Sequence, residues 1–503
     1  MHFGTRAKRL TYLVHRWTGV AGCLLMVLWF ISGVVMLYVG YPKLTPWERL
    51  GALPALQAAA CCVPADRALE RSGVQGAAQS LVLSSVRGAP HYLIRGQDGA
   101  YRVMDARTGR PAPEVDEQAA LDEARSFAHA APVRYGGTVF EDRWTHSRGL
   151  DAHRPLLVAQ VQGRAPATLY VSSATGQVVM DAPLSQQRWN YVGAWLHWLY
   201  MFRNHAVDPV WSWLVIALSA AGTVSAVTGI CVGLWRWRFS GRYKSGGKSP
   251  YRAPWMRWHH ITGLLFAGIV FTWILSGLMS MNPLGVFNAA GARPDRAAYQ
   301  GGPPAAEGVL ADPARIMAPL QAQGFHAVEL EWRMLAGQPY VLARNAAGGS
   351  RLVIGSAVGI RVLEHWEDAD VMAGASRLLP YPVASAQHMA QYDSYYYSRQ
   401  PEAMNGAAER RLPALRLDFG DPGQTRVYID LQSGDVAMSL DHRQRVGRWL
   451  FNFLHSWDIP WMLAAAHWRD AVLILLSLGG LLVSATGVVI GYVRLRTWLK
   501  AWR

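Results

Sequence analysis

Four long apolar runs constrain this chain more than any other feature of its sequence. They cover residues 10–41, 210–235, 258–281 and 471–493 of the 503-residue chain. A helix needs about 20 apolar residues to cross a bilayer, and core strands are much shorter. The first run is longer than the apolar part of a signal peptide and has no small-residue cleavage site, so we expect it to be retained. The sequence therefore predicts a mainly α membrane protein with four transmembrane helices.

Lys and Arg residues gather beside the ends of these runs, at the N-terminus, between residues 236 and 257, and in residues 494–503. By the positive-inside rule these segments are cytoplasmic. Both termini therefore lie on the cytoplasmic side of a bacterial inner membrane, and the large segments are periplasmic. The formal net charge is +15. Because many basic residues lie in short loops where they contact membrane lipid, we expect no nucleic-acid binding.

The apolar runs and the segments between them divide the chain into seven parts. In order these are transmembrane helix 1 (1–41), a first periplasmic domain (42–190), an interfacial helix with transmembrane helix 2 (191–237), a cytoplasmic loop (238–257), transmembrane helix 3 (258–281), a second periplasmic domain (282–446), and an interfacial helix, transmembrane helix 4 and cytoplasmic tail (447–503). Strand-like runs at 80–86, 156–162 and 425–431 alternate with helix-like stretches at 117–130 and 313–323. This alternation predicts two α+β domains.

The two halves of the chain repeat one another. His15-Arg16-Trp17-Thr18-Gly19 recurs 244 positions later as His259-His260-Ile261-Thr262-Gly263, and each copy is followed by a Ser-Gly pair. A second set recurs 258 positions later: Leu196-His197 as Leu454-His455, Thr228-Gly229 as Thr486-Gly487, and Arg236 as Arg494. The pattern indicates a tandem duplication of the unit helix, outer domain, helix.

The repeated histidines are the strongest candidates for function, because metal-binding side chains in or beside spans are costly to bury. His15 and His259 lie near the cytoplasmic ends of the first helix of each half, and Gly19 and Gly263 one turn later leave room for a flat macrocycle. We predict that a haem b is held between them. Arg236 and Arg494 would pair with its propionates. The adjacent His260 leaves the choice of ligand in the second half open.

A second repeated pair, His197 and His455, precedes the second helix of each half in aromatic surroundings that are typical of a membrane interface. We predict a second haem b between them, near the outer face. A single histidine in a span is more often a packing residue, but four that repeat at fixed offsets favour ligation. His205, His260 and His467 do not repeat and are weaker candidates.

The cysteines and missing motifs limit the cofactors. Without a CxxCH motif neither haem can be attached covalently, and no glycine-rich fingerprint for a flavin or nicotinamide is present. Cys61 and Cys62 can bond to each other or to a partner, and the sequence leaves their role open.

The sequence resembles the PepSY-associated transmembrane helix family, which includes inner-membrane di-haem reductases of ferric siderophores. The resemblance rests on His15-Arg16-Trp17-Thr18-Gly19 with Ser32-Gly33, Asp142-Arg143-Trp144, His153-Arg154-Pro155-Leu156, Tyr170 with Thr175-Gly176, Leu196-His197-Trp198-Leu199-Tyr200, and Asp393-Ser394-Tyr395-Tyr396-Tyr397. It implies two haems b, two PepSY-like periplasmic domains, and reduction of a periplasmic ferric chelate. It also implies a separate electron donor, either a quinol or a cytoplasmic reductase.

The substrate site is less constrained. Tyr395, Tyr396 and Tyr397, with His388 nearby, can form a chelate-binding surface, or they can be a buried strand or an aromatic interface belt. No catalytic residue is identified. Two other functions stay open: a PepSY membrane anchor that binds or restrains a periplasmic partner, and a respiratory haem subunit that feeds a periplasmic redox protein.

Overall fold

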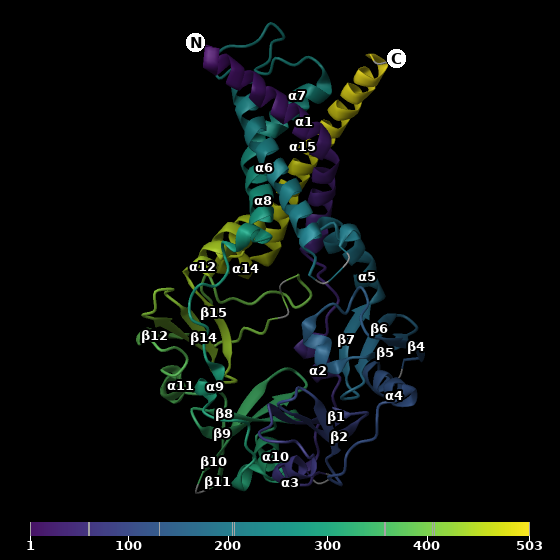
Figure 1. Cartoon of the computed structure of the whole chain (residues 1–503), viewed down its shortest axis with the longest axis vertical. Helices are drawn as coiled ribbons and strands as arrows, with labels where there is room; N and C mark the ends of the chain where they lie inside the picture. The colour runs from purple at the N-terminus through teal and green to yellow at the C-terminus, as the bar shows by residue number, and fades with distance from the viewer. Residues whose placement is uncertain are drawn as a thin grey trace.

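The computed structural model describes residues 2–501 apart from 59, 60, 130, 204, 206, 357, 358, 405 and 407. It consists of a helix bundle at one end and three β-sheets at the other (Figure 1). Both ends of the chain lie at the end of the bundle away from the sheets, on opposite sides of it. The chain thus leaves the bundle twice to build the sheets and returns to it each time.

The bundle is made of four helical units: α1 (His2–Met36), α6 (Pro209–Arg236), the pair α7 (Pro254–Leu265) and α8 (Ala267–Ser280), and α15 (Ala466–Ala501). Helix α1 packs against α6 and α15, while α7 packs against α15 and α8 against α6. Among the described residues, three helices are long and apolar enough to cross a membrane, or four if the bent pair α7–α8 is one span. The first helix ends at Met36, before the predicted boundary at residue 41.

The helix predicted over 258–281 is bent by 71° between α7 and α8. No proline lies at the bend, which falls at Phe266 between Gly263 and Gly268. The Phe266 ring lies against Gly479 of α15, where a Cβ atom would be 2.2 Å from a ring carbon. The bend therefore lies where the Phe266 ring packs on a neighbouring helix.

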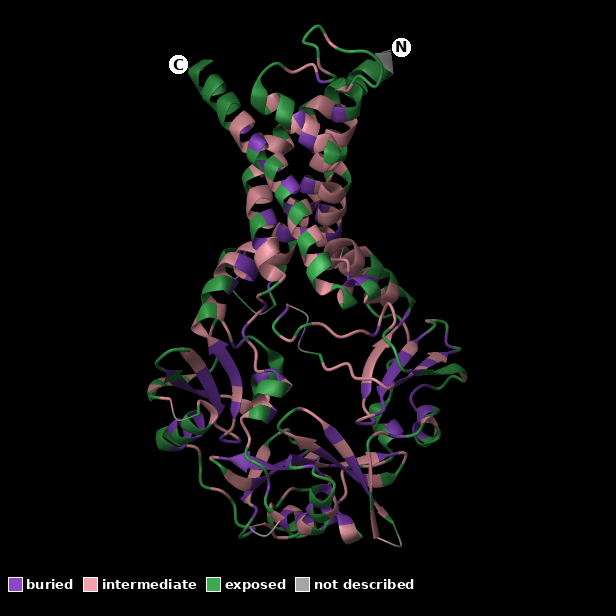
Figure 2. Ribbon diagram, turned by 180° about the vertical axis from the view of Figure 1, so that it is seen from behind, coloured by how far each residue is buried: buried purple, intermediate pink, exposed green. Residues whose placement is uncertain are grey.

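The surface of the bundle is apolar and open. Exposed and half-buried residues dominate it, whereas the sheets have continuous buried interiors (Figure 2). Leu24 is 62% exposed, Leu475 64% and Val210 80%. Large apolar surfaces on this scale are unfavourable in water, so the bundle is covered by an apolar phase. The chain is therefore a membrane protein.

In the described part of the chain, fifteen strands form three sheets. The seven-stranded sheet A has the order β11-β10-β9-β8-β1-β2-β3, sheet B the order β4-β5-β6-β7, and sheet C the order β12-β13-β14-β15. Their bounds are β1 Ser80–Val86, β2 Ala89–Arg95, β3 Tyr101–Asp105, β4 Val133–Val139, β5 Leu156–Val161, β6 Ala167–Ser172, β7 Val178–Pro183, β8 Ala327–Leu335, β9 Gln338–Asn345, β10 Ser350–Ser356, β11 Gly359–Leu363, β12 Val383–Met389, β13 Ala414–Phe419, β14 Arg426–Asp430 and β15 Val436–Leu440.

Short helices cover the sheets and their connections. They are α2 (Pro46–Gly51), α3 (Ala65–Arg71), α4 (Glu117–Phe127), α9 (Arg296–Gln300), α10 (Pro313–Ala322) and α11 (Asp368–Ala375). Cys61 and Cys62, just before α3, are bonded to each other.

Sheet A joins the two segments that the sequence divides into separate domains. Strand β1 of the first half pairs antiparallel with β8 of the second, with Leu81 opposite Trp332 and Leu83 opposite Leu330. These four side chains are fully buried, and the Trp332 ring lies 6.0 Å from the Tyr92 ring. The two halves therefore share one hydrophobic core and cannot separate without exposing it.

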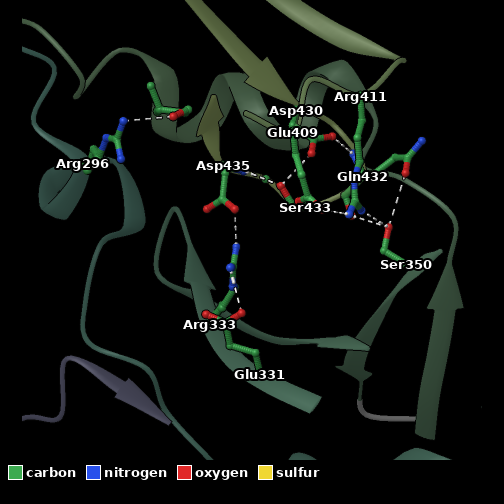
Figure 3. Close-up of polar contacts among 12 residues, drawn as sticks. Arg296, Glu331, Arg333, Ser350, Glu409, Arg411, Asp430, Gln432, Ser433 and Asp435 are labelled. Carbon is green, nitrogen blue, oxygen red and sulfur yellow. Dashed lines mark hydrogen bonds and ion pairs between the residues drawn. The ribbon is translucent and has the colours of Figure 1, made fainter. Parts of the chain in front are cut away.

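A polar network attaches sheet C to sheet A (Figure 3). Arg333 of β8 donates to Asp435 at 2.6 Å and to Glu331 at 2.8 Å. Tyr340 donates to the Ser433 carbonyl at 2.7 Å. Because Arg333 is largely buried and paired with two carboxylates, this contact fixes the position of sheet C on the shared sheet.

Candidate functional site

Two similar segments connect the sheets to the bundle. Sheet B is followed by α5 (Leu184–Asn190) and a π-helical turn, Tyr191–Trp195. Sheet C is followed by α12 (His442–Arg448), a π-helical turn at Trp449–Phe453, and α13 (Leu454–Ser456). Both helices begin before the predicted boundaries at 191 and 447, because Pro183 and the capping side chain of Asp441 start them earlier.

Each connecting segment presents one histidine just after its π-helical turn and then reverses direction. Leu199, two residues after His197, has φ +54°, and Trp457, two residues after His455, has φ +52°. The left-handed residue ends each segment and turns the chain back toward a span. In the first half the chain reaches α6 by way of a short 3-10 turn (Tyr200–Phe202), and in the second it reaches α15 by way of α14 (Pro460–Ala464). π-Helical turns are uncommon and often mark functional positions.

His197 and His455 form the first pair, here called the sheet-side pair. Their ring centroids are 6.2 Å apart and their planes are inclined by 77°. The Nδ1 atom of His197 lies 2.9 Å from the Ser32 hydroxyl, and that of His455 lies 2.9 Å from the Ser276 hydroxyl. Both rings are thus fixed by the Ser-Gly pairs of the first and third spanning units.

His15 and His259 form a second pair, here called the distal pair, nearer the ends of the chain. Their ring centroids are 6.3 Å apart and their planes are inclined by 35°. The Nδ1 atom of His15 lies 3.0 Å from the Ser225 carbonyl oxygen, and that of His259 lies 3.1 Å from the Val483 carbonyl oxygen. The neighbouring helices α6 and α15 therefore hold these rings by their backbones.

These hydrogen bonds set the protonation of the rings. A carbonyl only accepts, so Nδ1 of each distal ring carries the proton. The Ser32 hydroxyl donates to the Leu28 carbonyl at 2.6 Å, which leaves its oxygen free to accept from His197. The Ser276 hydroxyl donates in the same way to the Trp273 carbonyl at 3.0 Å. All four rings are thus arranged to present the Nε2 lone pair, as metal-binding histidines do.

The spacing within both pairs suits one metal ion between two imidazoles. A metal–nitrogen bond of about 2.0 Å on each side, with about 1.1 Å from nitrogen to ring centre, separates two centroids by about 6.2 Å. Among the described residues no group of three or more His, Cys, Asp or Glu side chains can hold a metal ion. Two histidines complete the coordination of an iron whose other four ligands come from a porphyrin.

Open space lies beside both pairs. A Cβ atom at Gly263 would meet no atom within 4 Å, and one at Gly19 would meet only the Ser225 hydroxyl at 4.0 Å. Beside the sheet-side pair lies a cavity of about 460 Å³, lined by Gly33, Gly277 and aromatic side chains. This volume is in the range of cofactor sites, about 300–1,000 Å³. The residues present at both pairs therefore fit a haem.

The two pairs lie at different depths in the bundle. Ser32, which contacts His197, is 17 residues after His15 on the same helix α1. At about 1.5 Å per residue this separates the pairs by about 25 Å along the helix. A bilayer core is about 30 Å thick. The two pairs can therefore lie near opposite faces of a membrane.

The other candidate histidines are placed elsewhere. His260 is buried, with Nδ1 2.8 Å from the Ser249 hydroxyl and Nε2 2.9 Å from the Gly233 carbonyl. Both of its nitrogens are occupied, so His259 and not His260 faces His15. His205 and His467 are exposed and lie in neither pair.

Of the arginines predicted near the distal pair, Arg236 donates from Nε to the Tyr12 hydroxyl at 2.9 Å. Tyr12 lies on α1 just before His15, so Arg236 lies close to the distal pair in depth. Arg494 is exposed on α15, seven residues after Gly487, whose Cα faces His259. Their pairing with propionates stays a prediction.

The structure corrects the predicted chelate-binding surface at Tyr395, Tyr396 and Tyr397. Tyr396 is completely buried and stacks on Tyr428 with ring centroids 5.1 Å apart. The Trp449 indole donates to the Tyr395 hydroxyl at 3.0 Å, and the Tyr397 hydroxyl donates to Asp458 at 3.3 Å. These tyrosines attach sheet C to the segment that carries His455, because their hydroxyls are used within the protein.

His388 does not join the tyrosines either. It pairs with Asp368 at 2.9 Å on the exposed side of strand β12. Its neighbour Met389 packs with Tyr396, and successive side chains of a strand point to opposite faces.

The residues that sequence reasoning missed are the partners of the histidines. Ser32 and Ser276 were recognisable only as small residues in repeated Ser-Gly pairs, each 17 positions after a distal histidine. Ser225 and Val483 act through their carbonyls, and a backbone contact leaves no signal in the side chain.

Comparison with known proteins identifies the family to which the chain belongs. A search of curated proteins finds no match to the chain. A family model described as the PepSY-associated TM region matches residues 12–494, which include all four histidines and all three sheets. The resemblance seen in the sequence is thereby confirmed, and the chain belongs to the PepSY-associated transmembrane family.

Proposed function

We propose that this protein is a haem-dependent oxidoreductase of the bacterial inner membrane that passes electrons across the membrane to a periplasmic ferric chelate. It holds two non-covalent haems b, one at the distal pair and one at the sheet-side pair. Its four spans come from a tandem duplication, both termini are cytoplasmic, and the three sheets are periplasmic. The observation that carries the proposal is the occurrence of two facing histidine pairs about 25 Å apart along one helix.

Bound haem would supply a one-electron Fe(III)/Fe(II) couple at each pair. The chain's own residues determine what that couple can do. His15 with His259, and His197 with His455, would each hold one haem iron between two imidazoles, and the group would then supply electron transfer and not oxygen chemistry. The Nδ1 hydrogen bonds keep each ring in the tautomer and orientation that a metal ligand requires.

The direction of transfer follows from the placement of the two pairs. The distal pair is nearer the chain ends, where a quinol or a cytoplasmic reductase donates one electron at a time. The sheet-side pair lies next to the sheets, where one electron reduces Fe(III) in a docked chelate to Fe(II). Chelators built from hard oxygen ligands hold Fe(II) more weakly, so the iron is released.

The test is a stopped-flow experiment with purified, anaerobically reduced protein and a ferric tris-hydroxamate chelate. We expect reoxidation of the haem bands, with one Fe(II), trapped by a coloured ligand, formed per electron lost. His197→Ala should stay reducible at the distal haem but should reduce the chelate much more slowly, while His467→Ala should match the wild type. Failure of the wild type to reduce any ferric chelate would contradict the proposed substrate class.

A further inference from the structure

The cavity beside the sheet-side pair has two chemically different walls. On the side of the first half it is lined by the aromatic residues Trp198, Tyr200 and Trp211. The positions 258 residues later, Ser456, Asp458 and Arg469, carry a hydroxyl, a carboxylate and a guanidinium. Of these, Ser456 lines the cavity, as does Arg399, while Asp458 and Arg469 lie outside the lining. The backbone arrangement of the two halves is similar here, but the chemistry is not.

Three arginines gather around Asp458 on the polar side. Arg399 lines the cavity and donates to the Asp458 carboxylate at 3.0 Å, Arg448 donates to the Asp458 carbonyl, and Arg469 donates to the Ser456 carbonyl at 3.0 Å. All three side chains are at least nine-tenths buried, and Asp458 is completely buried. Arg399, Arg448 and Arg469 are called the arginine cluster below.

The arginine cluster contains more positive than negative charge. Its carboxylates are Asp458 and Asp470, the latter 3.6 Å from Arg469. Among the described residues, the Nε and Nη1 atoms of Arg448 have no hydrogen-bond partner, and neither does one oxygen of Asp458. The Arg448 guanidinium lies over the Trp449 ring, 4.5 Å from its centroid, and over the Tyr397 ring at 5.4 Å, and these contacts offset part of its charge. The cluster still holds three guanidinium groups for two carboxylates, so a further anion would be stabilised there.

We propose that the arginine cluster binds a propionate carboxylate of the haem at the sheet-side pair, and that the aromatic wall of Trp198, Tyr200 and Trp211 receives the opposite, apolar edge. The inference rests on the proposed function. A haem has one edge with two carboxylates and one edge without charge, which matches the two walls. The guanidinium fork matches a carboxylate in a bidentate manner, and Arg399 already lines the cavity.

The haem at the sheet-side pair would then have a single orientation relative to the two halves of the chain. With identical walls, either orientation of the propionates would be equally favourable. Arg399 of the second half is the only Arg, Lys, Asp or Glu among the described residues that line the cavity, whereas Arg203 of the first half packs on the Tyr200 and Trp211 rings and is not part of the lining. The propionates therefore lie toward Arg399 and the segment that carries His455. The positive charge also favours the reduced haem, which carries one electron more.

The test compares Arg399→Gln and Arg399→Lys with Arg443→Gln, which removes the same charge from an exposed position on α12. We expect Arg399→Gln to lower the midpoint potential of the sheet-side haem, to shift its resonance Raman propionate-bending band, and to release this haem about tenfold faster to a haem-binding apoprotein. Arg399→Lys should keep the potential close to that of the wild type but shift the propionate band, since the charge remains and the fork is lost.

The outcomes separate this inference from the proposed function. A wild-type protein without haem would overturn both. The inference alone would be overturned if the wild type holds two haems and the Arg399→Gln and Arg443→Gln variants have the same propionate band and the same midpoint potential. A potential shift without a change in the propionate band would also overturn it, because the arginine would then act at a distance and not by contact.

Discussion

The distal and sheet-side pairs have almost the same spacing but are held in different ways. His15 and His259 lie within spanning helices and bond to backbone carbonyls of neighbouring helices. His197 and His455 lie on the connecting segments and bond to serine hydroxyls. The distal pair therefore depends mainly on helix packing, with the Thr486 hydroxyl as a further partner of His259. The sheet-side pair depends on single side chains and on segments attached to the sheets.

The largest expected effect comes from removing one ligand from each pair. His15→Ala and His197→Ala should each lose about one of two haems, because a haem with a single protein ligand is weakly held. Pyridine-haem quantitation on purified protein measures the loss. His260→Ala is the matched control, since both nitrogens of His260 bond within the protein, and it should keep both haems. Loss of haem in His260→Ala but not in His15→Ala would break the assignment of the distal pair.

A glycine next to each distal histidine sharpens the comparison between the two halves. A Cβ atom at Gly229 would lie 2.7 Å from Cε1 of His15, whereas one at Gly487 would lie 3.6 Å from Cε1 of His259. Gly229→Ala should displace the His15 ring and reduce distal haem affinity by about 10–100-fold, an overpacking cost of about 1–3 kcal/mol. Gly487→Ala should have little effect. Equal haem content in the two variants would show that the ring of His15 is not fixed by this contact.

The serines test whether the sheet-side pair is held by side chains. Ser32→Ala should lower the affinity for the sheet-side haem by about 10-fold. Loss of a hydrogen-bond partner of a metal ligand lowers affinity by about 10–100-fold, and we expect the lower end of this range. Thr486→Ala removes the hydroxyl 3.1 Å from Nδ1 of His259 but leaves the Val483 carbonyl, so its effect on the distal haem should be smaller. Rates of haem transfer to an apoprotein measure both effects. A larger effect in Thr486→Ala would reverse the comparison.

The smallest expected effect is a loss of folding stability in acid, which comes from an ion pair between α2 and sheet A. Glu329 of β8 is buried and bonded to Arg49 at 2.6 and 2.9 Å. Burial alone would raise its pKa, but Arg49 holds the pKa of this carboxyl below its ordinary value of 4.5. The stability that the pair contributes is therefore present above pH 4.5 and is lost as the pH falls through the lower folded-state pKa.

Thermal unfolding in detergent at pH 6 and below pH 4.5 should show this loss, with the sheet-side haem band changing before the distal band. Glu329→Gln should be less stable than the wild type at pH 6, because Arg49 loses its partner, but should lose less stability on acidification. Parallel pH dependence in the two proteins would contradict the role of this pair.

Local features of the fold could be predicted from the sequence. Strand β1 covers Ser80–Val86 and α4 begins at Glu117, both as predicted. Alternation, capping and turn chemistry act over a few residues and are visible in the sequence. The juxtaposition of the four histidines followed from repetition, because positions that recur in two halves tend to meet where the halves meet.

The features that could not be predicted are contacts between distant parts of the chain. The pairing of β1 with β8, the Phe266 ring against Gly479, and the arginines around Asp458 each join residues from different helices or sheets. Such contacts depend on how the elements pack and leave no periodic signal. The role of the tyrosine run was ambiguous for the same reason, since an aromatic run has the same sequence pattern whether it is buried or exposed.

The most direct test of the central claim is the haem content and electron paramagnetic resonance spectrum of the purified wild-type protein. The account predicts two haems b per chain and two low-spin ferric signals of equal amount. The distal pair, with planes inclined by 35°, should give a rhombic signal, and the sheet-side pair, with planes inclined by 77°, a strongly anisotropic one. A folded protein that binds no haem, or that binds haem with an open axial position, would contradict it.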